Sequence, residues 1–103
     1  MANPQCENGH TRIANELLEA LAYKINNSTW LKIMIYLIRI TYGFHRLEVE
    51  TNYQAIATKT GFTKDTIRHA LEDMHRLLFI KIRVVSKERI CVSIIKDYDL
   101  WKI

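Results

Sequence analysis

Two helical patterns meet at one glycine in the middle of the chain, and this junction constrains the fold more than any other feature. Asn52 begins the first pattern, NYQAIATKT, and Gly61 ends it. Thr63 precedes the second pattern, which runs from about Lys64 to Leu78. Asparagine and threonine are preferred at helix N-caps, and glycine is preferred where a helix ends in a left-handed residue. The sequence therefore predicts two helices joined by a tight turn.

The second helix of this pair has an apolar and a polar side. At about 100° per residue, one narrow stripe of the helix is entirely apolar. The stripe consists of Ile67, Leu71, Met74 and Leu78. Asp65, His69 and Arg76 point the opposite way. We therefore expect the stripe in the core and the other side in solvent.

A β-hairpin is predicted directly after the helical pair. The runs Phe79–Val85 and Ile90–Ile95 are rich in β-branched residues and alternate, and the charged segment Ser86–Arg89 lies between them. A helical pair with a tight turn, followed by a hairpin, is typical of the winged helix-turn-helix. The expected fold is thus α+β and mainly helical, with a C-terminal β-hairpin wing and a short extra N-terminal helix.

The N-terminal region completes the predicted domain. Residues 1–11 are polar and are predicted to form a flexible arm, so residues 12–103 form a single domain. The extra helix should begin near Ala14, and Asn26-Asn27-Ser28 should break it and cap the next helix. Its apolar positions are Leu17, Leu18, Leu21 and Ala22.

The next helix, from about Thr29 to Thr41, is apolar nearly all round, and Gly43 stands where a left-handed residue would end it. Its polar exceptions are Lys32, Tyr36 and Arg39. Such a helix needs burial on several sides, so one explanation is a homodimer through the Trp30–Ile40 region. A central core helix explains the pattern equally well. The apolar run from Trp30 to Ile40 is about half the length that a membrane span needs.

Two shorter segments are also predicted. Phe44–Glu50 alternates around Leu47 and Val49 and is expected to form a single strand. The tail DYDLWKI should fold back and bury Trp101. Five aromatic residues lie within or beside the apolar helices, so we expect only one of them, Tyr36, to be exposed. The five are Trp30, Tyr36, Tyr42, Phe44 and Tyr53.

The charge of the chain is concentrated in its C-terminal half. The net charge is +4, yet residues 1–58 carry five basic and five acidic side chains, and residues 90–103 carry two of each. Residues 59–89 carry eight basic against four acidic side chains, so the whole excess lies there. A clustered basic surface is typical of a polyanion-binding protein.

We therefore predict that the second helix of the pair enters the major groove of double-stranded DNA. Arg68 can form paired hydrogen bonds with guanine, and Asp65 either accepts a hydrogen bond from cytosine or only stabilises the first helical turn. Thr63 and Thr66 are short enough to bond phosphates, while Lys87 and Arg89 would reach flanking phosphates or a minor groove. The predicted DNA-binding residues are Lys59, Thr63, Lys64, Asp65, Thr66, Arg68, His69, Lys87 and Arg89.

Other classes of function find little support in the sequence. The four histidines and the cysteines Cys6 and Cys91 show no convincing metal-ligand spacing, and no nucleophile–base pair or phosphate-binding glycine loop is present. We expect no cofactor, no metal, no enzymatic activity and no membrane partner. Two cysteines without a signal peptide indicate a cytoplasmic protein.

The chain also resembles a known family. TRIANELLEAL, STWLKIMIYLIRITYGF, NYQAIATKTGFTKDTIRHAL and DYDLW resemble segments in the N-terminal DNA-binding domain of the lambdoid phage replication initiator (O protein) family. The resemblance spans His10 to Trp101, and Phe44 stands where the family usually has tryptophan. It implies a dimeric winged-helix domain that binds repeated sites of a phage replication origin, in the cytoplasm and nucleoid of a bacterial host. A helicase-loading partner is implied only if a region follows Ile103.

Two alternatives remain open. A small winged-helix transcription regulator would use the same DNA-contacting residues. A protein-interaction module would instead bind another protein and leave the basic face without a function.

Overall fold

Short-range capping interactions define most helix ends in the computed structural model, which describes residues 1–102. The Asn27 side chain caps α2 by accepting a hydrogen bond from the Trp30 amide, and Asn52 caps α3 in the same way. Gly61 ends α3 with φ of 83°, and Thr63 caps α4. The elements are η1 (Cys6–Asn8), α1 (Asn15–Lys24), α2 (Ser28–Thr41), η2 (Tyr42–Phe44), β1 (Glu48–Thr51), α3 (Tyr53–Thr60), α4 (Lys64–Arg76), β2 (Ile80–Val84), β3 (Ile90–Ile94) and η3 (Tyr98–Leu100).

The C-terminus of α4 corrects the sequence prediction. The helix ends at Arg76, and Leu78 adopts a left-handed conformation with φ of 65°. The Phe79 amide donates to the Met74 carbonyl and the Leu78 amide to the His75 carbonyl, which together form a Schellman motif. Leu78 occupies the position that glycine usually fills, so it lies outside the helix and does not continue the apolar stripe.

The end of α2 also differs from the prediction. Gly43 does not adopt positive φ; it lies within the 3-10 turn η2, and the left-handed residue is His45 with φ of 57°. A Cβ at position 43 would lie 2.7 Å from Arg39 Nη1 and 3.0 Å from Thr11 Oγ1. A larger residue there would therefore require the ends of these two side chains to shift.

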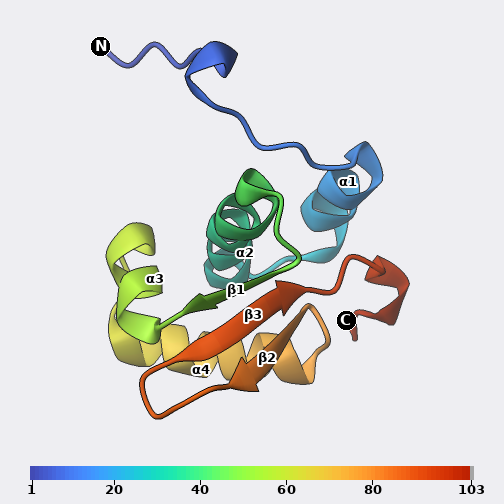
Figure 1. The fold of residues 1–103 in the computed structure, drawn as a ribbon. Helices are drawn as coiled ribbons and strands as arrows, with labels where there is room; N and C mark the ends of the chain where they lie inside the picture. The colour runs from blue at the N-terminus through green and yellow to red at the C-terminus, as the bar shows by residue number, and fades with distance from the viewer. Residues whose placement is uncertain (103) are drawn as a thin grey trace.

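The predicted hairpin is present and forms part of a larger sheet. β2 and β3 pair antiparallel, with Ile80 opposite Ile94 and Val84 opposite Ile90. β1 pairs antiparallel with the other edge of β3, so the strand order is β1-β3-β2 (Figure 1). The strand predicted over Phe44–Glu50 is β1, and it begins later than predicted, at Glu48. The reason is that η2 and the left-handed His45 occupy the first predicted residues.

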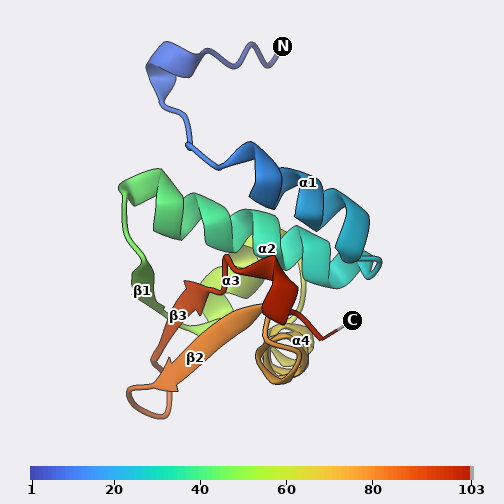
Figure 2. The same ribbon diagram turned by 90° about the vertical axis from the view of Figure 1, so that its right-hand side faces the viewer.

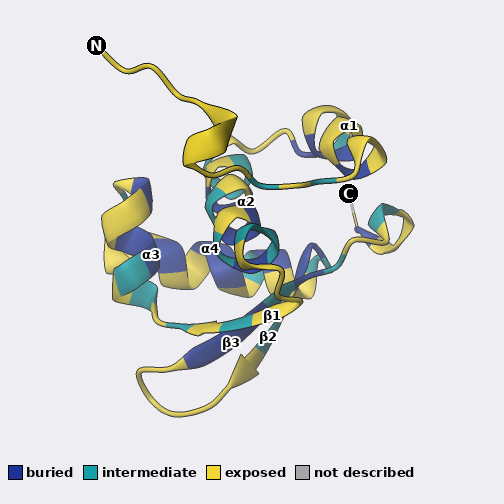
Figure 3. Ribbon diagram, turned by 45° about the horizontal axis from the view of Figure 1, so that its top comes forward, coloured by how far each residue is buried: buried dark blue, intermediate teal, exposed yellow. Residues whose placement is uncertain are grey.

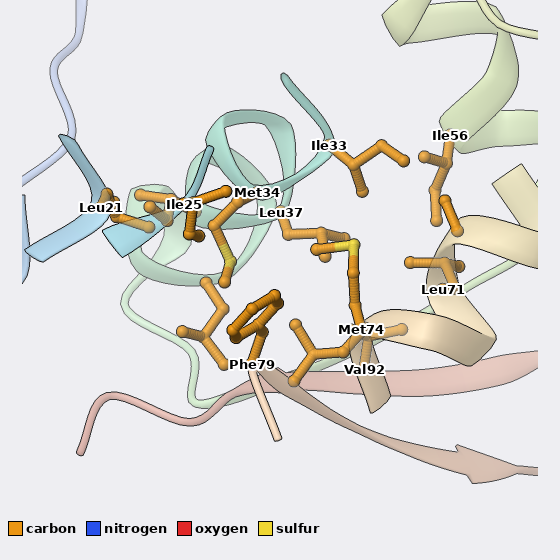
Figure 4. Close-up of a cluster of buried hydrophobic side chains, with 14 of the residues drawn as sticks. Leu21, Ile25, Ile33, Met34, Leu37, Ile56, Leu71, Met74, Phe79 and Val92 are labelled. Carbon is orange, nitrogen blue, oxygen red and sulfur yellow. The ribbon is translucent and has the colours of Figure 1, made fainter. Parts of the chain in front are cut away.

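The sheet, α3 and α4 surround one side of α2, and α1 covers the opposite side (Figure 2). Ile33, Met34 and Leu37 of α2 are fully buried, so this helix is the centre of the core. Phe79 packs edge-to-face against Trp30 and Trp101, with ring centroids 5.6 and 5.4 Å apart. Figure 4 shows buried side chains from α1, α2, α3, α4 and the sheet in one apolar cluster. The fold is α+β and mainly helical and is consistent with a winged helix.

Burial confirms some predicted positions and corrects others. Trp101 is buried and its indole N–H donates to the Ile95 carbonyl at 2.7 Å, as the tail prediction requires. Leu17 and Leu21 of α1 are buried, but Leu18 is exposed because it lies on the outer side of the helix. Phe44 is exposed as well, beneath the Arg39 guanidinium, and is not the core residue predicted.

Candidate nucleic-acid interface

The N-terminal end of α4 lies beside the wing loop, residues 85–89, which connects β2 to β3 (Figure 1). An ion pair joins the two, because Lys64 Nζ lies 3.4 Å from Glu88 Oε2. Figure 3 shows the wing loop exposed along its length, and all five of its residues are solvent-accessible. The fold thus brings two separately predicted groups of residues onto one surface.

The first turn of α4 is held by its threonine cap. The Thr63 hydroxyl oxygen accepts from the Thr66 amide at 3.2 Å, and the two hydroxyls bond to each other at 2.9 Å. Lys64, Asp65 and Arg68 of this helix are all exposed, whereas Ile67 is fully buried. His69 is exposed too. The predicted division of α4 into a core side and a solvent side is confirmed for these residues.

Arg68 lies between two carboxylates. Its guanidinium is 3.6 Å from Asp65 and 4.0 Å from Glu72, on the preceding and following turns of the helix. All three side chains are exposed, so these ion pairs are weak, about 0.3–0.5 kcal/mol each. A stronger partner, such as a guanine edge or a phosphate, can therefore displace them. Asp65 is accordingly a partner of Arg68 in the free protein.

The basic residues of the wing differ in how far they are neutralised. Arg89 Nη1 lies 3.9 Å from Glu50 on β1. Within residues 1–102, Lys87 has no carboxylate within ion-pair distance, and neither does Lys59 at the end of α3. On β2, a hydrogen bond of 2.9 Å to Glu48 raises the pKa of Arg83 above its ordinary value. Lys59 and Lys87 are therefore the predicted residues that carry uncompensated charge.

One basic residue near this surface is absent from the predicted set. Lys32 of α2 places its ammonium 4.6 Å from the centroid of the Phe62 ring, in the turn between α3 and α4. Sequence spacing cannot reveal this contact, because it joins residues thirty positions apart. The alternation of Lys32 with apolar neighbours indicates only that it faces away from the core.

The surface also has open cavities away from this interface. One of about 400 Å³ lies between the N-terminal segment and the end of α2 and is lined in part by His10, Arg39 and Phe44. Over residues 1–102, no three His, Cys, Asp or Glu side chains converge as metal ligands would. No helix in the same range is long and apolar enough to cross a bilayer.

Comparison with known proteins identifies the family. The family model for bacteriophage replication protein O matches residues 3–101, and this range includes α3, α4 and the wing. A search of curated proteins and a search of solved structures each found no match. Since the matched range covers nearly all of its residues, the chain belongs to the bacteriophage replication protein O family.

Proposed function

We propose that this chain binds double-stranded DNA sequence-specifically, at repeated sites of a phage replication origin, and so initiates DNA replication. It belongs to a family whose N-terminal domain binds origin DNA. The observation that carries the proposal is the pairing of the exposed end of α4 with the charged wing loop through Lys64 and Glu88. This arrangement presents a helix and a flanking loop to the same duplex.

The proposed contacts follow from groove dimensions. A major groove about 12 Å wide admits one helix, so the N-terminal half of α4 would meet base edges there. Arg68 would exchange its weak carboxylate partners for guanine, and Lys87 would contact a phosphate on the flanking backbone. Lys59, Thr63, Lys64, Asp65, Thr66, His69 and Arg89 complete the proposed interface. The function needs no catalytic group and no cofactor, and its place is the cytoplasm of the bacterial host.

Footprinting on the source genome tests the proposal. We expect protection of several clustered repeats in a replication origin. Protection of a single promoter site would instead identify a transcription regulator. Absence of duplex binding in a mobility-shift assay at low salt, where phosphate attraction is strongest, would reject DNA binding and leave a protein-interaction role.

Two substitutions separate the proposed base contact from the proposed phosphate contact. Arg68→Ala should weaken specific binding by about 1–3 kcal/mol and relax base preference at one position. Arg76→Ala is its control, because Arg76 makes a similar ion pair with Asp73, at 3.1 Å, in the last turn of the same helix. If Arg68→Ala leaves the preferred sequence and its affinity unchanged, the proposed placement of α4 is wrong.

Lys87→Ala should act differently, since a phosphate contact carries no sequence information. It should weaken binding to all duplexes alike and reduce the salt dependence. Lys96→Ala is the control, because Lys96 is exposed beyond the end of β3 that lies opposite the wing. A sequence-dependent loss for Lys87→Ala would contradict this role.

We further propose that the domain acts as a homodimer through the outer side of α2. Ile35 is 60% exposed there, and Leu18 of α1 is 52% exposed. Both line an apolar groove of about 300 Å³ between the two helices. α1 lies on the side of α2 away from α4 (Figure 2), so pairing through these two helices would leave both DNA-facing surfaces free.

Sedimentation at micromolar concentration tests the dimer. We expect a species of twice the chain mass and its loss in Ile35→Glu, because a buried carboxylate opposes association. A 12.2 kDa species alone would contradict the proposal. A helicase-loading partner belongs to the proposal only for a chain with a further region after Ile103.

A further inference from the structure

Lys32 extends from α2 across the turn that precedes α4. Its ammonium lies 4.6 Å from the centroid of the Phe62 ring. That ring is half-buried and packs against the core, which fixes its position. The ammonium is also 3.7 Å from the point where a Cβ on Gly61 would be. The charge of Lys32 is therefore held directly above the turn, next to the first residues of α4.

Positive charge gathers around this position in the free protein. The N-terminus of α4 carries the positive end of the helix dipole, and Lys59 and Lys64 flank the same turn in sequence. No carboxylate of residues 1–102 lies within ion-pair distance of Lys32. The cation–π contact with Phe62 offsets only about 0.5–1 kcal/mol at an exposed site. An anion at the turn would be attracted by Lys32, Lys59 and the helix dipole together, and by Lys64 once that ammonium is released from Glu88.

We propose that Lys32 contacts a DNA phosphate beside the groove that α4 enters, so the interface includes α2 as well as α4 and the wing. The inference rests on the proposed function. Phe62 acts as a positioning residue, because its ring directs the lysine side chain toward the turn. A phosphate contact positions the protein and contributes the same free energy for any base sequence.

The test compares duplex binding by the wild-type chain, Lys32→Met, Lys32→Arg and the control Lys96→Met over a series of salt concentrations. Methionine keeps a flexible side chain against Phe62 but removes the charge. Each duplex contains either an origin repeat or a scrambled sequence. Lys32→Met should weaken binding to both duplexes by the same factor and reduce the log–log salt slope by about 0.9, whereas Lys32→Arg and Lys96→Met should keep the wild-type slope.

The outcomes separate this inference from the function on which it rests. If the wild-type chain binds the repeat and Lys32→Met keeps the wild-type affinity and slope, the inference is wrong and the proposed function stands. A loss confined to the repeat would also overturn it, because a phosphate contact cannot distinguish the sequences. If the wild-type chain binds neither duplex, the proposed function itself fails.

Discussion

Glu88 at the tip of the wing is expected to oppose DNA binding, so its neutralisation should strengthen that binding. In the free protein Glu88 holds Lys64, whose ammonium lies 3.4 Å from its carboxylate. A bound duplex would compete for Lys64 and would place phosphates near the Glu88 charge. Glu88→Gln removes both the competition and the repulsion while keeping nearly the same side-chain volume.

The magnitude follows from the ion-pair geometry. Two unit charges 3.4 Å apart attract by about 1.2 kcal/mol in water. Both side chains are exposed, so salt and the entropy of ordering them reduce the net free energy to about 0.2–1 kcal/mol. Release of Lys64 should therefore raise the affinity by a factor of about 1.4–5. The free energy of unfolding should fall by no more than about 1 kcal/mol.

Fluorescence anisotropy with a labelled repeat and a labelled scrambled duplex measures this effect. The gain should appear with both duplexes and should shrink in a Lys64→Gln background, where no ammonium can be released. Glu19→Gln is the control, because Glu19 is exposed on α1 and has no cationic partner within ion-pair distance among residues 1–102. An unchanged or lower affinity for Glu88→Gln, relative to Glu19→Gln, would refute the reasoning.

Three further predictions concern the fold. Gly61→Ala should lower the free energy of unfolding by about 1 kcal/mol, because φ of 83° disfavours a side chain. Leu78→Gly should raise the free energy of unfolding by up to about 1 kcal/mol, because glycine relieves the strain of the positive φ at that position. Urea titration measures both values, and effects of the same sign would contradict the prediction. Phe79→Ala removes a fully buried ring and should lower the free energy of unfolding by about 3–5 kcal/mol, and a loss below about 1 kcal/mol would contradict the central packing of this ring. Burial raises the pKa of Tyr42, so the folded state favours the neutral phenol; this stabilisation is present below about pH 10 and is lost as pH rises through the raised pKa. Tyr42→Phe should therefore lose less thermal stability above about pH 10 than the wild-type chain, and an equal loss would contradict the shift.

Features determined by neighbouring residues could be predicted from the sequence. The caps at Asn27, Asn52 and Thr63 each depend on a side chain and an amide three residues away. The helical pair, the hairpin and the buried positions Ile67, Leu71 and Met74 of α4 follow from short-range periodicity. For this reason the order of these elements and the solvent-facing side of α4 agree with the structure.

Features that depend on tertiary contacts could not be predicted in this way. Gly43 leaves room for the side chains of Arg39 and Thr11, which packing brings close to it. This role of the glycine does not depend on where α2 ends. The pairing of β1 with β3 joins segments about forty residues apart. The same limit applies to the candidate site, since the sequence cannot show that Glu88 reaches Lys64 or that Lys32 reaches Phe62.

Footprinting of the wild-type chain and of Arg68→Ala on the phage origin tests the central claim most directly. The account predicts that the wild-type chain protects clustered repeats and that Arg68→Ala loses this protection at concentrations where Arg76→Ala retains it. Equal protection by Arg68→Ala and the wild-type chain, or no protection of any repeat by the wild-type chain, would contradict the account.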